Sequence, residues 1–271
     1  MGIRTTNLKL FLACAGIMFA AGDIATAQQP FNTDDIGITP RHHWHFELAN
    51  EFDIVAAESY PNLRQNTANL KVAFGLFENL EVGVDNQAIT IMNANSLLVE
   101  RNVFGVGDLD FSVKYSFLKE KLGSRRPGLA ASFAIEFPTG DASRQLGSGL
   151  RDYVGNGIAQ FPLTDKTKLR INAGLVFAGN TLTGAVGLKT RGVVYTGGTS
   201  VTHQFTDKLL LGVELTGAST ANFDLGRGAV LGQFGGNYSL RKNMTLDFAV
   251  SKGTFPGAPR AGALAGISVD F

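Results

Sequence analysis

Apolar and polar residues alternate along most of the chain. The clearest run lies at 108–117, where Leu109, Phe111 and Val113 alternate with aspartate, serine and lysine. Because successive side chains of a β-strand point to opposite faces, this pattern predicts strands with one apolar and one polar face. It predicts such strands at 44–54, 68–76, 80–85, 108–117, 129–137, 153–161, 169–177, 193–205, 209–217, 230–240, 244–250 and 261–271.

The connections between these strands fall into two classes that alternate along the chain. Short ones lie at 78–79, 163–167, 206–208 and 241–243, with 118–127 as a longer member of this class. Longer, glycine-rich ones lie at 91–107, 138–152, 179–192, 218–228 and 253–260. Short periplasmic turns, longer external loops and an even strand number are typical of bacterial outer-membrane barrels. The predicted fold class is all-β, a transmembrane antiparallel up-and-down β-barrel of about 12 strands.

The first residues have the features of a secretory signal. Arg4 and Lys9 flank the start of a short apolar run, and Ala25-Thr26-Ala27 forms an Ala-x-Ala cleavage site. Beyond it, no apolar stretch approaches the roughly 18 residues of a membrane helix. We predict a signal peptide at 1–27, a periplasmic N-terminal segment and candidate plug at 28–40, and an outer-membrane barrel at 41–271.

A secreted β-sandwich is the competing fold, because alternation also describes a sheet with one wet face. The aromatic residues favour the barrel, since tracing the chain up and down gathers them at two rims. One rim takes Trp44, Phe74, Tyr115, Phe117, Phe161, Phe205, Tyr238 and Phe271, and the other takes Phe52, Phe137, Tyr153, Phe177 and Tyr195. Two aromatic girdles are expected where a barrel meets the lipid headgroups.

Composition and charge narrow the range of partners. Charged residues make up 17% of the chain and its formal net charge is +1, so neither a polyanion nor nucleic acid is an evident partner. Cys14, the only cysteine, lies in the predicted signal, which leaves the mature chain without a thiol. The glycine clusters lack the Gly-Lys-Ser/Thr of a phosphate-binding loop. The sequence therefore predicts no cofactor and no metal.

The four histidines do not predict an active site. His42, His43 and His45 crowd the start of the first strand, and His203 takes the lipid-facing register near a turn. An outer-membrane hydrolase would need a histidine near the outer leaflet beside a serine. We interpret these histidines as rim residues and predict that the chain is not an enzyme. A metal site at 42–45 is a weaker alternative, because only His43 and His45 share a strand face.

The polar faces of the predicted strands carry an excess of acidic residues. The candidate lumen and selectivity residues are Glu47, Glu51, Lys71, Glu81, Asp85, Asp108, Asp110, Lys114, Glu136, Arg170, Glu214 and Asp247. A water-filled lumen with this lining concentrates negative potential and favours cations over anions. With a strand number between the filled small barrels and the wide porins, the bore is expected to be narrow.

The chain ends on Phe271, with Ile267 and Val269 at alternate positions before it. This ending resembles the C-terminal signature of outer-membrane barrels, in which a terminal aromatic residue is read by the assembly machinery. The resemblance implies the barrel assembly machinery as a partner. Outer-membrane lipid and periplasmic chaperones are expected as further partners of an exported barrel, together with a small solute that the sequence does not identify.

Three motifs resemble a known outer-membrane family. They are Phe31-Asn32-Thr33-Asp34-Asp35 near the start, Gly105-Val106-Gly107-Asp108-Leu109 before the fourth strand, and Phe137-Pro138-Thr139-Gly140-Asp141 with Gly147-Ser148-Gly149 after the fifth. The resemblance is to the family named for a putative MetA pathway of phenol degradation, and it runs across most of the mature chain. It implies a barrel that acts in transport, with aromatic compounds suggested by the family name.

The leading function is an outer-membrane channel or transporter for passive uptake or efflux of small solutes. A non-conducting barrel that serves structure or adhesion is the alternative, and an outer-membrane enzyme is the least favoured class. Thr33-Asp34-Asp35 has two interpretations of its own: a plug or rim contact inside the barrel mouth, or an Asx-rich turn before the first strand.

Overall fold

The computed structural model describes residues 30–57, 62–93, 100–122, 126–147, 149–179, 191–220, 228–255 and 257–271. The predicted signal peptide and the first two residues of the N-terminal segment lie outside these ranges. None of the described residues belongs to a helix that is long and apolar enough to cross a membrane.

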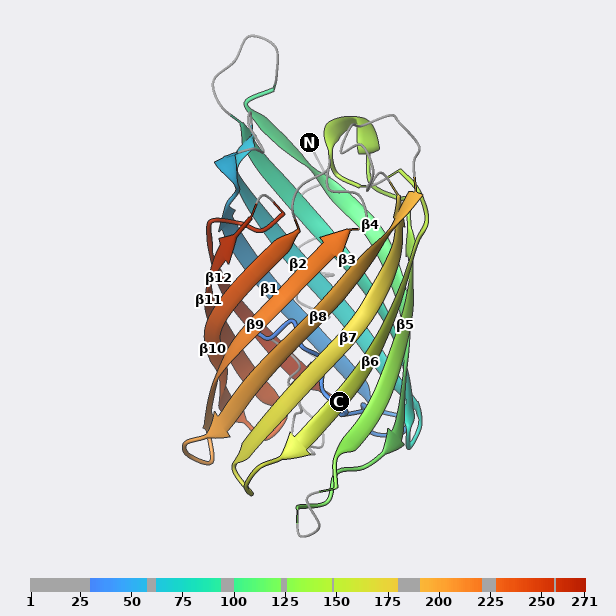
Figure 1. Cartoon of the computed structure of the whole chain (residues 1–271), viewed down its shortest axis with the longest axis vertical. Helices are drawn as coiled ribbons and strands as arrows, with labels where there is room; N and C mark the ends of the chain where they lie inside the picture. The colour runs from blue at the N-terminus through green and yellow to red at the C-terminus, as the bar shows by residue number, and fades with distance from the viewer. Residues whose placement is uncertain are drawn as a thin grey trace, which may run out of the picture.

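Within the described residues, twelve strands form one closed antiparallel barrel, as predicted (Figure 1). They are β1 (Trp44–Ile54), β2 (Asn62–Phe77), β3 (Leu80–Asn93), β4 (Asn102–Leu118), β5 (Gly128–Phe137), β6 (Asp152–Pro162), β7 (Thr167–Gly179), β8 (Arg191–Gln204), β9 (Leu209–Thr220), β10 (Ala229–Arg241), β11 (Met244–Thr254) and β12 (Ala261–Asp270). Each strand pairs with its neighbours in sequence, and β12 closes against β1. Closure of this kind leaves no open sheet edge, which is what a strand in lipid requires.

Polar side chains face the interior of the barrel and apolar side chains face outward. In β1, Glu47 and Ala49 are buried whereas Phe46 and Leu48 are exposed, and the alternation continues along the strand. This is the inverse of a soluble domain and it is the arrangement expected for a barrel surrounded by lipid.

The strands β2, β3 and β4 are longer than predicted, and the predicted loop at 91–107 is wrong. Only residues 94–101 separate β3 from β4. The reason is a local reversal of polarity, since Ile89, Ile91 and Val103 are apolar yet buried. The alternation rule reads such residues as lipid-facing, so it loses the strand at this point.

The short connections gather at one end of the barrel, the turn end, and the long ones at the other, the loop end (Figure 1). At the turn end the closing strands meet through aromatic rings. Trp44 contacts Phe74 with ring centroids 4.7 Å apart, and Phe46 meets Phe271 edge-on at 5.4 Å. Backbone hydrogen bonds between Trp44 and Phe271 extend the β1–β12 pairing to the last residue.

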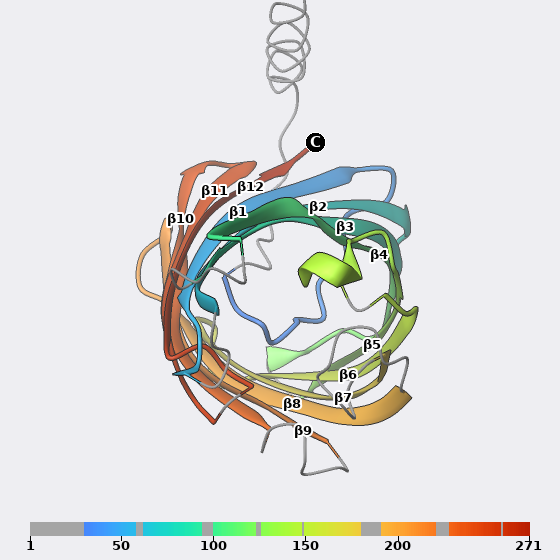
Figure 2. The same ribbon diagram turned by 90° about the horizontal axis from the view of Figure 1, so that it is seen from above.

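The connection between β5 and β6 folds into the loop end of the barrel. It carries the short 3-10 helix η3 (Ala142–Arg144), which lies over the interior in the view from above (Figure 2). Leu146, which follows this helix, is buried in a cluster with Ile89, Ile91 and Val103. The inward apolar residues of β3 and β4 therefore serve as the anchor of this loop.

Candidate functional site

Residues 30–39 run through the interior of the barrel before the chain reaches β1 (Figure 2). We call residues 30–39 the inner segment. At its exit the His42 N–H donates to the Gly75 carbonyl at 2.7 Å. Gly75 is required there, because a Cβ atom at this position would clash with the carbonyl of Pro40.

The inner segment lies against a row of polar side chains that crosses five strands. The row consists of Gln160, Arg170, Ser200, Glu214 and Gln233, one from each of β6 to β10. These residues are direct partners in the antiparallel register of successive strands, and all five are buried. We call this set the polar row.

Four members of the polar row bind the inner segment directly. The Gln233 amide donates to the Pro30 carbonyl at 2.6 Å. The Glu214 carboxylate accepts the backbone N–H groups of Asn32 and Thr33 at 2.9 and 2.6 Å. The Ser200 and Thr33 hydroxyls are 2.7 Å apart, and Arg170 lies 3.3 Å from the Asp35 carboxylate. Residues 30 to 35 therefore follow the row strand by strand.

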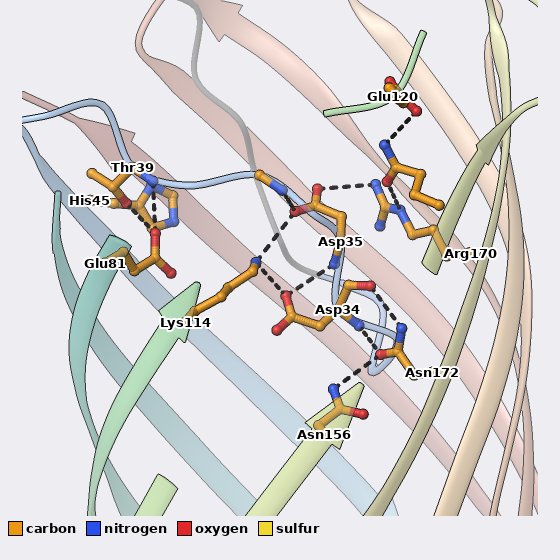
Figure 3. Close-up of polar contacts among 12 residues, drawn as sticks. Asp34, Asp35, Thr39, His45, Glu81, Lys114, Glu120, Asn156, Arg170 and Asn172 are labelled. Atoms are coloured by element: carbon orange, nitrogen blue, oxygen red, sulfur yellow. Dashed lines mark hydrogen bonds and ion pairs between the residues drawn. The ribbon is translucent and has the colours of Figure 1, made fainter. Parts of the chain in front are cut away.

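The two aspartates of the inner segment meet cations from two walls (Figure 3). Lys114 Nζ lies 2.8 Å from Asp34 Oδ1 and 3.5 Å from Asp35 Oδ1, while Arg170 approaches Asp35 Oδ2. Burial would raise the pKa of the Asp35 carboxyl, but the charges of Arg170 and Lys114 outweigh burial and lower that pKa to about 2. Asp35 is therefore ionised throughout the physiological pH range.

Further hydrogen bonds fix the inner segment along its length. The side chain of Asn172 accepts from the Asp34 N–H at 2.6 Å and donates to the Asp34 carbonyl at 3.0 Å. The Glu81 carboxylate accepts from both the N–H and the hydroxyl of Thr39, at 2.7 and 2.8 Å. Asp35 Oδ1 also accepts from the Gly37 N–H at 2.8 Å, which is an Asx turn. The turn and the lumen contact, weighed above as alternatives, occur together.

A second row, made of carboxylates, crosses β3 to β6. Asp85, Asp110, Glu136 and Asp152 are successive register partners, and we call them the acidic row. Lys71 is the partner of Asp85 on β2, and Glu47 is the partner of Lys71 on β1. Like charges directly opposite each other destabilise a strand pair. Packing alone therefore does not account for the acidic row.

Three members of the acidic row, Asp85, Asp110 and Glu136, line two cavities in the barrel interior. The larger has a volume of about 750 Å³ and is lined by Glu51, Asp85, Asp110 and the inner segment from Phe31 to Asp34, among others. The smaller, of about 240 Å³, is lined by Asp108, Asp110, Glu136 and Leu146, among others. Asp108 also accepts from the Gly140 N–H at 2.8 Å, so it fixes the loop that folds into the mouth.

The remaining candidates lie near the closure of the barrel. His45 is buried, with its two ring nitrogens 2.7 Å from Glu47 and 2.5 Å from Asp270, so it faces the interior rather than the rim. Asp247 accepts from the Ser268 hydroxyl at 2.7 Å. No three histidine, aspartate or glutamate side chains among the described residues are arranged to hold a metal ion.

The structure places all twelve candidate lumen residues on the inner side, in three settings. Four of them hold the inner segment: Glu81, Lys114, Arg170 and Glu214. Seven line the cavities: Glu47, Glu51, Lys71, Asp85, Asp108, Asp110 and Glu136. Asp247 instead accepts from Ser268 near the closure of the barrel. Sequence reasoning missed Asn172, Ser200 and Gln233, which also hold the segment. These residues lie on the polar faces of predicted strands and could have been found there, but they are uncharged and a search limited to charged residues does not include them.

Comparison with solved structures finds the same fold in outer-membrane channels and porins. The COG4313 outer membrane channel from Pseudomonas putida F1 is 11% identical, with a TM-score of 0.65 over 90% of this chain and 99% of that chain. The NanC porin is 13% identical, with a TM-score of 0.57 over 83% and 98%. The KdgM porin is 11% identical, with a TM-score of 0.54 over 84% and 99%.

No curated protein matches the chain. A family model described as "Putative MetA-pathway of phenol degradation" matches residues 33–271, and it therefore includes most of the inner segment and the whole barrel. The chain belongs to this family.

Proposed function

We propose that the chain is an outer-membrane channel for small solutes, with an acid-lined lumen that favours cationic and neutral polar solutes over anions. In this proposal residues 1–27 are a cleaved signal peptide, and Phe271 is the residue that the barrel assembly machinery reads. The shared fold with outer-membrane channels and porins supports this class of function and this location.

The acidic row is the observation that carries the proposal. Four carboxylates on adjacent strands face one another across their strand pairs, where like charges reduce stability. Fixed charges in a cleft with low-dielectric walls focus the potential and raise the local concentration of counter-ions. The row therefore favours entry of cations and disfavours entry of anions.

The inner segment restricts the pore on the side of the turn end. It forms part of the wall of the larger cavity, and both edges of the segment are fixed to the barrel, through the polar row and through Lys114 and Glu81. We propose that solutes pass beside this segment or displace it.

The family description connects the chain with phenol degradation, which makes aromatic compounds candidate solutes. An acid-lined cavity is a poor environment for a purely apolar ring, because polar groups must lose water to accommodate it. We therefore propose that aromatic solutes of this channel carry an amine or several polar groups.

Reversal potentials in planar bilayers test the proposal. The purified mature protein under a potassium chloride gradient should give steady, cation-selective current steps. The double variant Asp110→Asn/Glu136→Gln should move the reversal potential toward zero, because it removes two neighbouring charges of the acidic row.

A matched control removes two charges outside the lumen. Asp165→Asn/Asp207→Asn changes two exposed residues in short connections and should leave the reversal potential unchanged. Anion selectivity in the unaltered protein would refute the acidic-lumen proposal. Absence of current from protein whose heat-modifiable gel migration shows that it is folded would favour the non-conducting barrel instead.

A further inference from the structure

We propose that Lys114, Arg170 and Asn172 form a binding site for small dicarboxylates, and that Asp34 and Asp35 occupy this site as an internal mimic of the ligand. Lys114 lies closer than Asp110 to the turn end of β4, so a dicarboxylate that enters from the turn end reaches the site without passing the acidic row. Such a ligand would displace residues 30–39 from the wall. The inference rests on the proposed function, in which these residues restrict the channel.

The cations are arranged as a carboxylate clamp. Lys114 and Arg170 reach different oxygens of the same Asp35 carboxylate, at 3.5 and 3.3 Å, and Lys114 also reaches Asp34 at 2.8 Å. One cation comes from β4 and the other from β7, so they approach from separate parts of the wall (Figure 3). Two neighbouring carboxylates bracketed in this way resemble a single small dicarboxylate.

The clamp is buried while the inner segment is bound, so its two cations need an anionic partner in that state. Lys114 is 4% exposed and Arg170 is 7% exposed. A buried cation whose partner is removed is strongly destabilising, because its lost hydration is not replaced. If Asp34 and Asp35 leave, another anion can make the contacts with Lys114 and Arg170 that these two carboxylates made.

The surrounding wall supplies little anionic compensation at Arg170. Its register partners on the polar row are Gln160 and Ser200, both uncharged, and Gln160 Oε1 accepts from Arg170 Nε at 3.3 Å. Lys114 has Glu81 as its register partner on β3, but Ser132 on the other side is neutral. The pair of cations as a whole therefore still requires an anion.

The neutral groups of the site suit an oxygen-rich ligand. The Asn172 amide both donates to and accepts from the main chain of Asp34, and Asn156 lies 3.5 Å from the same amide oxygen. Such groups can bind the second carboxylate or a hydroxyl of a small organic acid. An aliphatic diacid of about four carbons satisfies both cations without the backbone that the inner segment carries.

Competition explains why the site would bind such an acid weakly in the resting protein. A tethered occupant acts at an effective concentration in the millimolar range or above. The apparent affinity of a free ligand falls by the fraction of molecules in which the site is vacant. Removing the two internal carboxylates should therefore expose the intrinsic affinity.

Titration calorimetry with succinate on the full-length mature protein, at low ionic strength, tests the inference. The double variant Asp34→Asn/Asp35→Asn keeps the side-chain shapes but removes both charges. We expect it to bind succinate at least about tenfold more tightly than the unaltered protein. Succinamide, the neutral isostere of succinate, should not bind measurably to the double variant.

Adding Lys114→Gln to the double variant should abolish succinate binding, in protein shown to be folded by heat-modifiable migration. Equal affinity for succinate in the unaltered protein and the double variant would overturn the inference, as would binding that survives Lys114→Gln. Bilayer conductance separates this inference from the proposed function. Higher conductance of the double variant without succinate binding would keep the restricting segment but refute the ligand site, whereas succinate binding without any conductance would refute the channel.

Discussion

The polar row and the acidic row are built alike but differ in what they face. Each takes one inward residue from each of several adjacent strands, in direct register. The polar row mixes an acid, a base and neutral groups, and the inner segment binds four of its five members. The acidic row carries one sign of charge, and three of its four members line the cavities.

This difference suits the two rows to different tasks: the polar row to holding a peptide segment, and the acidic row to acting on solutes in the lumen. A mixed row matched group by group to a peptide compensates each buried polar atom, so it stabilises one position of that peptide. A row of one sign cannot compensate itself and creates a field in the space beside it. Only the second kind of row can discriminate between mobile solutes, which is why we propose selectivity as the role of the acidic row.

The largest expected effect comes from breaking the ion pair between Arg170 of the polar row and Asp35 of the inner segment. Arg170→Met leaves Asp35 buried with Lys114 as its remaining cation at 3.5 Å. Removing one partner of a buried pair costs about 3–5 kcal/mol, so the inner segment should detach at least about 100-fold more often. A Thr33→Cys background measures this detachment through maleimide labelling, because Thr33 is 1% exposed.

The matched control for this prediction is Lys208→Met in the same background, since Lys208 is an exposed cation in a short turn. Labelling of Thr33→Cys should be unaffected by this change. Equal labelling rates in the Arg170→Met and Lys208→Met proteins would show that the polar row does not hold the segment.

A smaller effect is expected at the loop that borders the acidic row. Leu146→Ala removes most of a side chain buried against Ile89, Ile91 and Val103. Such truncations cost about 2–5 kcal/mol, and here the cost is expected in the local docking of the loop. Trypsin cleavage after Arg144, which lies in the same loop, should accelerate at least about tenfold, because cleavage follows the open population.

Leu163→Ala, a change of an exposed leucine in a short connection, is the control for the loop. It should leave cleavage after Arg144 at the rate of the unaltered protein. If Leu146→Ala also leaves that rate unchanged, the apolar cluster does not anchor the loop, and the smaller cavity is not maintained by it.

The alternation of apolar and polar residues along the strands predicted more of this structure than the distribution of charged residues did. Because side chains alternate along a strand, the sequence placed all twelve candidate residues on the inner face, from Glu47 to Asp247. It also predicted the number of strands and their closed antiparallel arrangement. The alternation of side chains is a local property, because about ten residues of one strand are enough to show it. The strand number and the closure were inferred instead from the alternation of short and long connections along the whole chain.

The two rows could not be predicted, because they depend on register between strands. Asp110 opposes Glu136 only for one relative shift of β4 and β5, and a long connection between two strands does not determine that shift. The contact between Thr33 and Glu214 joins residues 181 positions apart. No local pattern in residues 30–35 distinguishes a turn in solvent from a segment bound inside a barrel.

The smallest expected effect is the detachment of the inner segment from the polar row at low pH. The pKa of Asp35 is lowered from 3.8 to about 2 by Arg170 and Lys114, against the effect of burial. A lowered pKa in the bound state means that the contact is fully stabilising above the unbound value and weakens as pH falls toward the bound value. The segment should therefore stay bound at pH 5 and detach progressively between about pH 4 and pH 2.

Pepsin, which is active in acid, can follow this release by cleavage at Phe31, a buried residue of the segment. In the unaltered protein cleavage should be slow at pH 4 and accelerate toward pH 2. In the Asp35→Asn variant, used as the reference at each pH, it should already be fast at pH 4. Equal cleavage rates for the two proteins at pH 4 would mean that the Asp35 charge does not hold the segment. Within the polar row, Glu214, Ser200 and Gln233 would then be the residues that hold it.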